Sequence, residues 1–125
     1  MLLAEDNALN QIVAKGFLSK FSVEVDLAVN GQMAVEMFCA SEPDYYDAIL
    51  MDIQMPVMDG LEATQAIRRS THPNAKTIQI IAQTADAFSE DITRVLAAGM
   101  NAHIAKPIES ELLAKTLYKA FTIKK

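Results

Sequence analysis

Short apolar runs alternate along this chain with longer segments in which apolar residues recur every three or four positions. Short runs are typical of strands buried on both faces of a parallel sheet, and the longer pattern is typical of helices that pack one face against it. The predicted strands are 1–4, 23–27, 47–52, 77–82 and 102–105. The predicted helices are 9–21, 33–38, 61–67, 88–98 and 112–121. This alternation predicts an α/β fold, a doubly wound five-stranded parallel sheet with right-handed crossovers and helices on both faces.

Residues with strong local preferences lie between these elements. Asn7 can cap the first helix, and the Asn30-Gly31 pair predicts a turn after the second strand. Glu42-Pro43 ends the second helix, because a residue before proline disfavours helical geometry. Gly99 is well suited to the end of the fourth helix. The sequence contains no internal repeat, low-complexity run or interdomain linker, so we expect residues 1–125 to form one domain.

Composition and charge narrow the class of protein. Hydrophobic residues make up 51% and charged residues 22% of the 125 positions, as in an ordinary globular domain. The net charge of −5, from 11 basic and 16 acidic side chains, disfavours direct binding to nucleic acid. No apolar run approaches the roughly 18–20 residues that span a bilayer, and no signal peptide is visible, so we expect a cytoplasmic domain without membrane insertion. The single cysteine, Cys39, cannot form an internal disulfide and is expected to be an inert, buried thiol.

The third predicted strand ends in a carboxylate. Its apolar run stops at Asp52, and a carboxylate at the mouth of a buried strand needs a partner, because an unpaired buried charge is costly. Pro56 cannot serve a strand ladder, and Asp59-Gly60 is a turn signal, so a loop begins after Asp52. Open α/β sheets bind their ligands at this position, just beyond the carboxyl ends of the strands.

Other strand ends carry chemistry as well. The residues at these ends are Glu5-Asp6, Asp52, Gln83-Thr84 and Lys106-Pro107. They converge at one edge of a parallel sheet, where carboxylates ~4 Å apart repel by about 4 kcal/mol at an effective dielectric constant near 20. A hard divalent cation relieves that repulsion, and oxygen ligands favour Mg²⁺ or Mn²⁺. Lys106 and the Thr84 hydroxyl add a cation and a donor for an incoming phosphoryl group, so the set indicates phosphoryl transfer onto a carboxylate.

Each of these residues also has a simpler interpretation. Glu5-Asp6 can merely complement the dipole of the first helix, and Asp59-Gly60 is explained by turn chemistry. Thr84 can equally cap the helix that follows it, and a lone Lys106-Pro107 pair indicates nothing. The hypothesis of a phosphoryl site depends on four strand ends carrying these groups together.

The sequence resembles the receiver domain of two-component response regulators over essentially its whole length. The matching stretches are 2–7, 51–60, 83–85 and 104–107. The resemblance implies the flavodoxin-like strand order 2-1-3-4-5. It also implies that Asp52 accepts a phosphoryl group from a phosphohistidine on a histidine kinase or a histidine phosphotransfer protein. The domain would catalyse its own phosphorylation and dephosphorylation.

The resemblance implies roles for the surrounding residues. Asp6 would bind Mg²⁺ directly, Glu5 mostly through water, and the Gln54 carbonyl would be a further ligand. Lys106 would pair with the phosphoryl oxygens, and Thr84 would turn inward to bond one of them. The Lys106–Pro107 bond would be cis.

Finer similarity is to receivers attached to hybrid sensor histidine kinases. It lies in Asn7 with Asn10, in residues 52–60 and in residues 98–108. No effector domain is visible in the 125 residues. We therefore expect this chain to be excised from a larger one, which a membrane sensor can tether, with the first strand clipped at its start.

Three polar residues depart from the expected pattern or lack an assigned role. His103 stands where the family often has a Tyr or Phe that reports the state of Thr84, although it can also be a strand histidine satisfied locally. Its ring is expected to turn inward on phosphorylation and change the surface of the fourth helix, fifth strand and fifth helix, the usual partner surface in the family. Gln83 is polar where the family is usually apolar. His72, in a loop, is expected to be solvated.

Three other functions are alternatives to the phosphoryl-accepting switch. A pseudo-receiver, an interaction module that is never phosphorylated, would lack an acid, Asp52 or Lys106, and none is missing. A phosphatase that forms an aspartyl-phosphate would carry a second acid where this chain has Gln54. A flavin carrier would need a Gly-rich and hydroxyl-rich phosphate loop after the first strand, where Glu5 and Asp6 would repel a phosphate.

Overall fold

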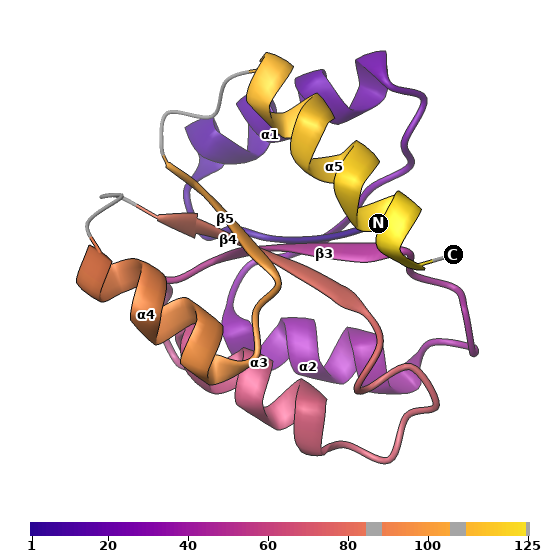
Figure 1. Ribbon diagram of the computed structural model, residues 1–125, viewed down its shortest axis with the longest axis vertical. Coiled ribbons are helices and arrows are strands. Elements are labelled where there is room, and N and C mark those ends of the chain that lie inside the picture. The colour runs from indigo at the N-terminus through magenta and orange to yellow at the C-terminus, as the bar shows by residue number, and fades with distance from the viewer. Residues whose placement is uncertain (85–88, 106–109, 125) are drawn as a thin grey trace.

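Strands and helices alternate along the whole chain (Figure 1). The computed structural model describes residues 1–84, 89–105 and 110–124. The strands are β1 (Leu2–Ala4), β2 (Asp26–Ala28), β3 (Ala48–Asp52), β4 (Gln79–Thr84) and β5 (Ala102–Ala105). The helices are α1 (Ala8–Lys20), α2 (Gly31–Ala40), α3 (Gly60–Arg69), α4 (Ser89–Ala98) and α5 (Ser110–Lys124).

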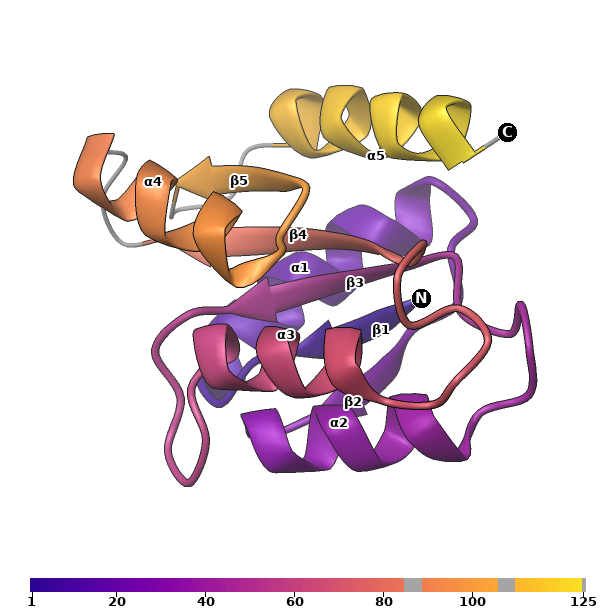
Figure 2. The same cartoon turned by 60° about the horizontal axis from the view of Figure 1, so that its bottom comes forward.

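All strand pairs in the sheet are parallel, and the order is β2-β1-β3-β4-β5. This order confirms the prediction. Leu3 lies opposite Leu50, which lies opposite Ile81, so these apolar side chains form one layer across the sheet. In Figure 2 the arrows of β1, β3 and β5 all point to the left, so their carboxyl ends meet at one edge.

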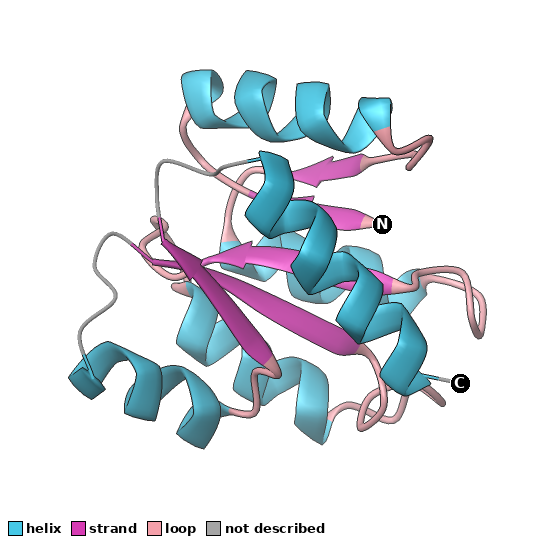
Figure 3. Ribbon diagram, turned by 45° about the horizontal axis from the view of Figure 1, so that its top comes forward, coloured by secondary structure: helices cyan, strands magenta, loops and turns pink. Residues whose placement is uncertain are grey.

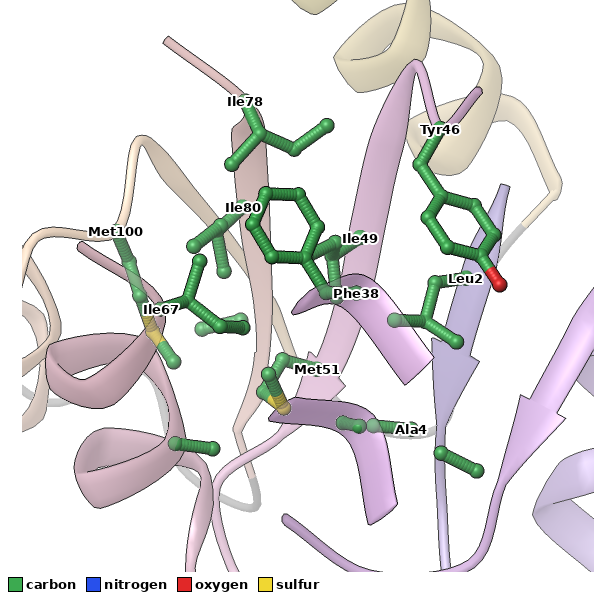
Figure 4. Packing of buried hydrophobic residues seen from close by; sticks show 14 of the residues in the cluster. Leu2, Ala4, Phe38, Tyr46, Ile49, Met51, Ile67, Ile78, Ile80 and Met100 are labelled. Carbon is green, nitrogen blue, oxygen red and sulfur yellow. The ribbon is translucent and has the colours of Figure 1, made fainter. Parts of the chain in front are cut away.

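Helices cover both faces of the sheet (Figures 1 and 3). Helices α2, α3 and α4 pack on one face, where the buried cluster includes Phe38, Ile67 and Val95. Figure 4 shows Phe38 and Ile67 in this cluster. Helices α1 and α5 pack on the other face, through Leu18 and Leu113 among others. The strands are therefore buried on both sides, which explains why they read as continuous apolar runs.

Side-chain oxygens cap three of the helices. The Oδ1 atom of Asn7 accepts a bond from the backbone N–H of Asn10 at 3.1 Å, which confirms its expected role. Asn30 does the same for α2, so the Asn30-Gly31 pair starts a helix directly after the strand. Asp59 caps α3 through its Oδ1 atom, and its place in the sequence is explained by this capping.

Two strands are shifted from their predicted positions by two or three residues. Val23 and Val25 pack against the core but lie before β2, which starts at Asp26 because only residues 26–28 find register with β1. Strand β4 continues to Thr84 because it pairs with β3 as far as Gln83 and with β5 as far as Thr84. Pairing across the sheet, which local pattern does not contain, decides these boundaries.

Two expectations about single residues were wrong. Cys39 is exposed, because α2 turns Ala34 and Phe38 toward the core and leaves Cys39 on its outer side. His72 is half-buried, with its ring centroid 4.4 Å from that of Phe38. Among the described residues, no helix is long and apolar enough to cross a bilayer.

Candidate functional site

Three carboxylates meet at the carboxyl edge of the sheet. Glu5 follows β1 at the edge, Asp6 comes next, and Asp52 is the last residue of β3. One oxygen from each lies within 4.8 Å of the others. Glu5 is fully buried and Asp52 is 3% exposed, whereas Asp6 is open to solvent. The predicted convergence of these side chains is confirmed.

Short local bonds orient two of these acids. The Oε2 atom of Glu5 accepts a bond from the backbone N–H of Asn7 at 3.1 Å. The Glu5 carbonyl accepts a second bond from the Gln11 side chain at 2.8 Å, so the first turn of α1 holds this residue in place. The Oδ1 atom of Asp52 accepts a bond from the backbone N–H of Gln54 at 3.2 Å.

The loop between β3 and α3 returns to the site through a glycine. The Gly60 N–H donates to the Ile53 carbonyl at 2.8 Å, which brings the start of α3 against the end of β3. A Cβ on Gly60 would collide with the carbonyl oxygen of Asp52. Sequence reasoning explained Gly60 as part of a turn and missed this close approach. The only local signal was its place at the start of a predicted helix.

The same loop carries a strained residue. Val57 has φ of +68°, in the left-handed region that a β-branched side chain rarely adopts, and it is 77% exposed. The neighbouring Met58 carbonyl accepts a bond from the Gly31 N–H at 3.0 Å, so the loop is tied to the start of α2. Figure 2 shows this loop projecting from the lower left of the molecule. The sequence did not indicate the strain.

Thr84 and Gln83 end β4 beside Asp52. Thr84 is 2% exposed, and its Oγ1 atom has no hydrogen-bond partner among the residues that the structure describes. The residues between Thr84 and the start of α4 at Ser89 lie outside those that the structure describes, so capping by Thr84 stays a prediction. Gln83 is fully buried, and neither its amide nitrogen nor its amide oxygen has a partner in the described part of the chain.

His103 lies on β5 at the far side of the sheet from the acids of β1. It is half-buried and lines a groove of about 1080 Å³ together with Leu96, Leu112 and Tyr118. Those three side chains are 43–75% exposed, and they come from α4 and α5. Within the described ranges, the His103 ring makes no hydrogen bond, and its role stays a prediction.

The structure leaves part of the predicted site undescribed. Lys106 and Pro107 lie outside the described residues, and with them the approach of Lys106 to Asp52 and the geometry of the bond before Pro107. Gln54 is exposed and follows Asp52 by two residues, and the role of its carbonyl stays a prediction.

The donor set suits a hard metal ion. Its three side chains are carboxylates, two of them buried, and together they could hold one cation. No nitrogen or sulfur ligand from a described residue belongs to the cluster, so it fits Mg²⁺ better than a softer transition metal.

The sequence matches a known protein family and several characterised relatives. Residues 1–118 match the response regulator receiver domain family. The chain is 40% identical over 119 residues to hybrid signal transduction histidine kinase I of Dictyostelium discoideum, and the match covers 94% of this chain and 7% of that protein. It is 40% identical over 122 residues to two-component system protein A of Emericella nidulans, covering 97% of this chain and 17% of that protein. The chain therefore spans a small part of both relatives.

Solved structures of receiver domains are similar to this chain in both sequence and fold. The receiver domain of a sensor histidine kinase from Pseudomonas aeruginosa is 39% identical, with a TM-score of 0.86, covering 97% of this chain and 95% of that one. That structure holds a magnesium ion coordinated in its active-site cleft. The receiver domain of Ssk1 from Saccharomyces cerevisiae, crystallised with the histidine phosphotransfer protein Ypd1, gives 30% identity and a TM-score of 0.85, covering 98% and 88% of the two chains.

Proposed function

The chain belongs to the response regulator receiver domains of two-component phosphorelays, and we propose that it is an active phosphoryl acceptor rather than a pseudo-receiver. The observation that carries the proposal is the cluster of Glu5, Asp6 and Asp52 at the carboxyl edge of the sheet. A domain that only bound partners would gain nothing from three carboxylates held this close, because they repel one another. Asp52 is the acceptor, since it is the central acid of the sheet.

Magnesium is the cofactor that this cluster would hold. Asp6 and Asp52 would bind it directly, Glu5 mostly through water, and the Gln54 carbonyl would complete the protein ligands. The magnesium in the Pseudomonas receiver supports this assignment. When bound, the ion would offset the negative charge that gathers as a phosphoryl group approaches a carboxylate.

Phosphoryl transfer would proceed by displacement at phosphorus. An oxygen of Asp52 forms the new O–P bond while the P–N bond to the donor imidazole breaks, and the nitrogen keeps the electron pair. Lys106 would pair with the phosphoryl oxygens, and the Thr84 hydroxyl would donate to one of them. Thr84 is suited to this because its buried hydroxyl has no other partner in the described part of the chain.

The donor would be a phosphohistidine on a partner protein. The complex of the yeast receiver with Ypd1 supports a histidine phosphotransfer protein as one partner. The hybrid kinases among the relatives support a second arrangement, in which this domain is one part of a longer kinase chain. Both sources present the same phosphorylated imidazole to Asp52.

Phosphorylation would be transmitted to the surface formed by α4, β5 and α5. Thr84 moving toward the phosphoryl group would leave room beside β5, into which the His103 ring would turn from the groove that it lines. Comparison of NMR spectra with and without beryllium fluoride, in wild type and His103→Ala, tests this. Identical shifts of the α5 resonances in both proteins would make His103 a bystander.

The proposal is tested by labelling with acetyl phosphate and Mg²⁺, followed by mass spectrometry. We expect one phosphoryl group on the wild type, none on Asp52→Asn, and none on the wild type in EDTA. Asp59→Asn is the matched control, because Asn can still cap α3, and it should label normally. An unlabelled wild type would favour the pseudo-receiver, and a labelled Asp52→Asn would overturn the assignment of the acceptor.

A further inference from the structure

Gln83 is the polar residue that the proposed mechanism leaves without a role. It is fully buried in β4, and its amide nitrogen and oxygen both lack partners among the described residues. Most buried side-chain amides in proteins are paired, because leaving them unpaired destabilises the folded state. A buried amide without a partner therefore needs an explanation.

Its position is beside the acceptor. Gln83 is the register partner of Asp52 on one side and of Ile104 on the other. Register partners on parallel strands point to the same face of a sheet, about 4.8 Å apart. Ile104 belongs to the cluster under α1 and α5, so Gln83 and Asp52 both lie on that face.

The layer that contains these residues is polar, whereas the layer below it is apolar. Leu3, Leu50 and Ile81 form the apolar layer. Two residues further along each strand stand Glu5, Asp52 and Gln83. Asp52 thus has a carboxylate neighbour on the β1 side and an amide neighbour on the β4 side. The amide is the one neutral hydrogen-bond donor of these three side chains.

We propose that Gln83 is a state-selective donor, whose amide N–H bonds an oxygen of the phosphorylated Asp52 side chain. The inference builds on the proposed function of Asp52. At rest the amide has no partner within residues 1–84, 89–105 and 110–124, and it would acquire one when Asp52 carries a phosphoryl group. A hydrogen bond made only in the phosphorylated form stabilises that form relative to the resting form. Gln83 thereby raises the stability of the phosphorylated form at the expense of the resting form.

The test is the substitution Gln83→Met, which keeps the length of the side chain and removes both polar atoms. Without Mg²⁺ or phosphodonor, we expect the urea midpoint of unfolding to rise, because an unpaired amide is gone. With Mg²⁺, the affinity for beryllium fluoride, read by ¹⁹F NMR, should fall by about tenfold, the factor for one lost hydrogen bond to a charged group. The rate of labelling by acetyl phosphate should fall as well.

Gln79→Met is the matched control, since Gln79 lies four residues earlier on the same strand and is 7% exposed. It should leave the affinity for beryllium fluoride unchanged. Wild-type affinity in Gln83→Met would overturn the inference and leave the role of Asp52 intact. Lower stability of both Gln83→Met and Gln83→Leu without ligand would also overturn it, since the amide would then be paired at rest. A wild type that neither binds beryllium fluoride nor accepts label would instead remove the proposed function.

Discussion

The two ends of the sheet differ in whether their polar side chains have hydrogen-bond partners among the described residues. At the amino ends of β4 and β5, the half-buried Arg68 donates to four oxygens, those of the carbonyls of Ala75, Ile78 and Gly99 and of the Asn101 side chain, at 2.8–3.1 Å. Burial lowers the pKa of this guanidinium, but an arginine remains charged at any ordinary pH. These bonds distribute its charge over three backbone carbonyls and one side-chain amide oxygen.

The same end contains other paired side chains. The Nε2 atom of His72 lies 2.9 Å from the Ser41 carbonyl, and its Nδ1 atom accepts from the Asn74 N–H at 3.0 Å. Since Nδ1 accepts, Nε2 carries the proton and donates to Ser41. Asn74 and Asp44 bond each other twice, at 2.7 and 2.9 Å. These bonds tie the end of α2 to the loop before β4.

At the carboxyl end, by contrast, Thr84 and Gln83 are buried without hydrogen-bond partners in the described part of the chain, next to clustered carboxylates. The difference indicates a division of labour. One end uses polar groups to hold segments together, and we propose that the other keeps polar groups for a ligand. The following predictions test that comparison.

The largest expected effect is on stability at the amino end. Arg68→Ala removes five hydrogen bonds and should lower the free energy of unfolding by about 3 kcal/mol, measured in urea. Arg69→Ala, at an exposed neighbour with one bond of 3.3 Å, should change it by less than about 0.5 kcal/mol. Labelling of folded Arg68→Ala should remain normal. Equal losses in the two variants would contradict the structural role of Arg68.

The second prediction concerns both stability and phosphorylation at the carboxyl end of the sheet. Gly60→Ala forces a methyl group onto the Asp52 carbonyl, so it should lower the free energy of unfolding by about 2 kcal/mol and also slow labelling of Asp52. Gly16→Ala, in an exposed part of α1 with open space around it, should raise stability by roughly 0.5–1 kcal/mol. Normal labelling in Gly60→Ala would show that the close approach of Gly60 to Asp52 is not needed for phosphorylation.

A third measurement concerns metal binding. Mg²⁺ at about ten times its dissociation constant should stabilise the wild type by about 1.4 kcal/mol, since it binds only the folded protein. Asp52→Asn removes one of the three carboxylates and should reduce this gain, whereas Asp59→Asn should keep it. Thermal unfolding with and without Mg²⁺ reads the effect. An undiminished gain in Asp52→Asn would place the ion elsewhere.

The smallest effect should come from the strained loop. Val57→Asn should raise the free energy of unfolding by about 0.5–1 kcal/mol, because Asn adopts a positive φ more readily than a β-branched residue. Val29→Asn is the control, at a partly exposed valine outside the left-handed region, and it should bring no gain. Urea unfolding measures both. A loss in Val57→Asn would show that the valine itself makes stabilising contacts.

The fold and the acidic cluster could be predicted because each depends on patterns that lie within one segment. The apolar run that begins at Ala48 indicates a buried strand by itself, and the carboxylate of Asp52 at its end marks the edge of the sheet. Parallel pairing then brings Glu5 and Asp6 to the same edge, whatever the details of the loops. The roles of Lys106, Gln54 and Thr84 remain predictions.

Sequence alone therefore determined the order of strands and helices, the capping of α1 by Asn7, and the meeting of three acids at one edge. Tertiary structure decided what His72, Arg68 and Gly60 do. Each of these acts on a group that belongs to another element, such as the Ser41 carbonyl 31 residues from His72 or the Asp52 carbonyl against Gly60. Periodicity records which face of its own element a residue occupies, but only the packed chain decides which atoms of another element it meets.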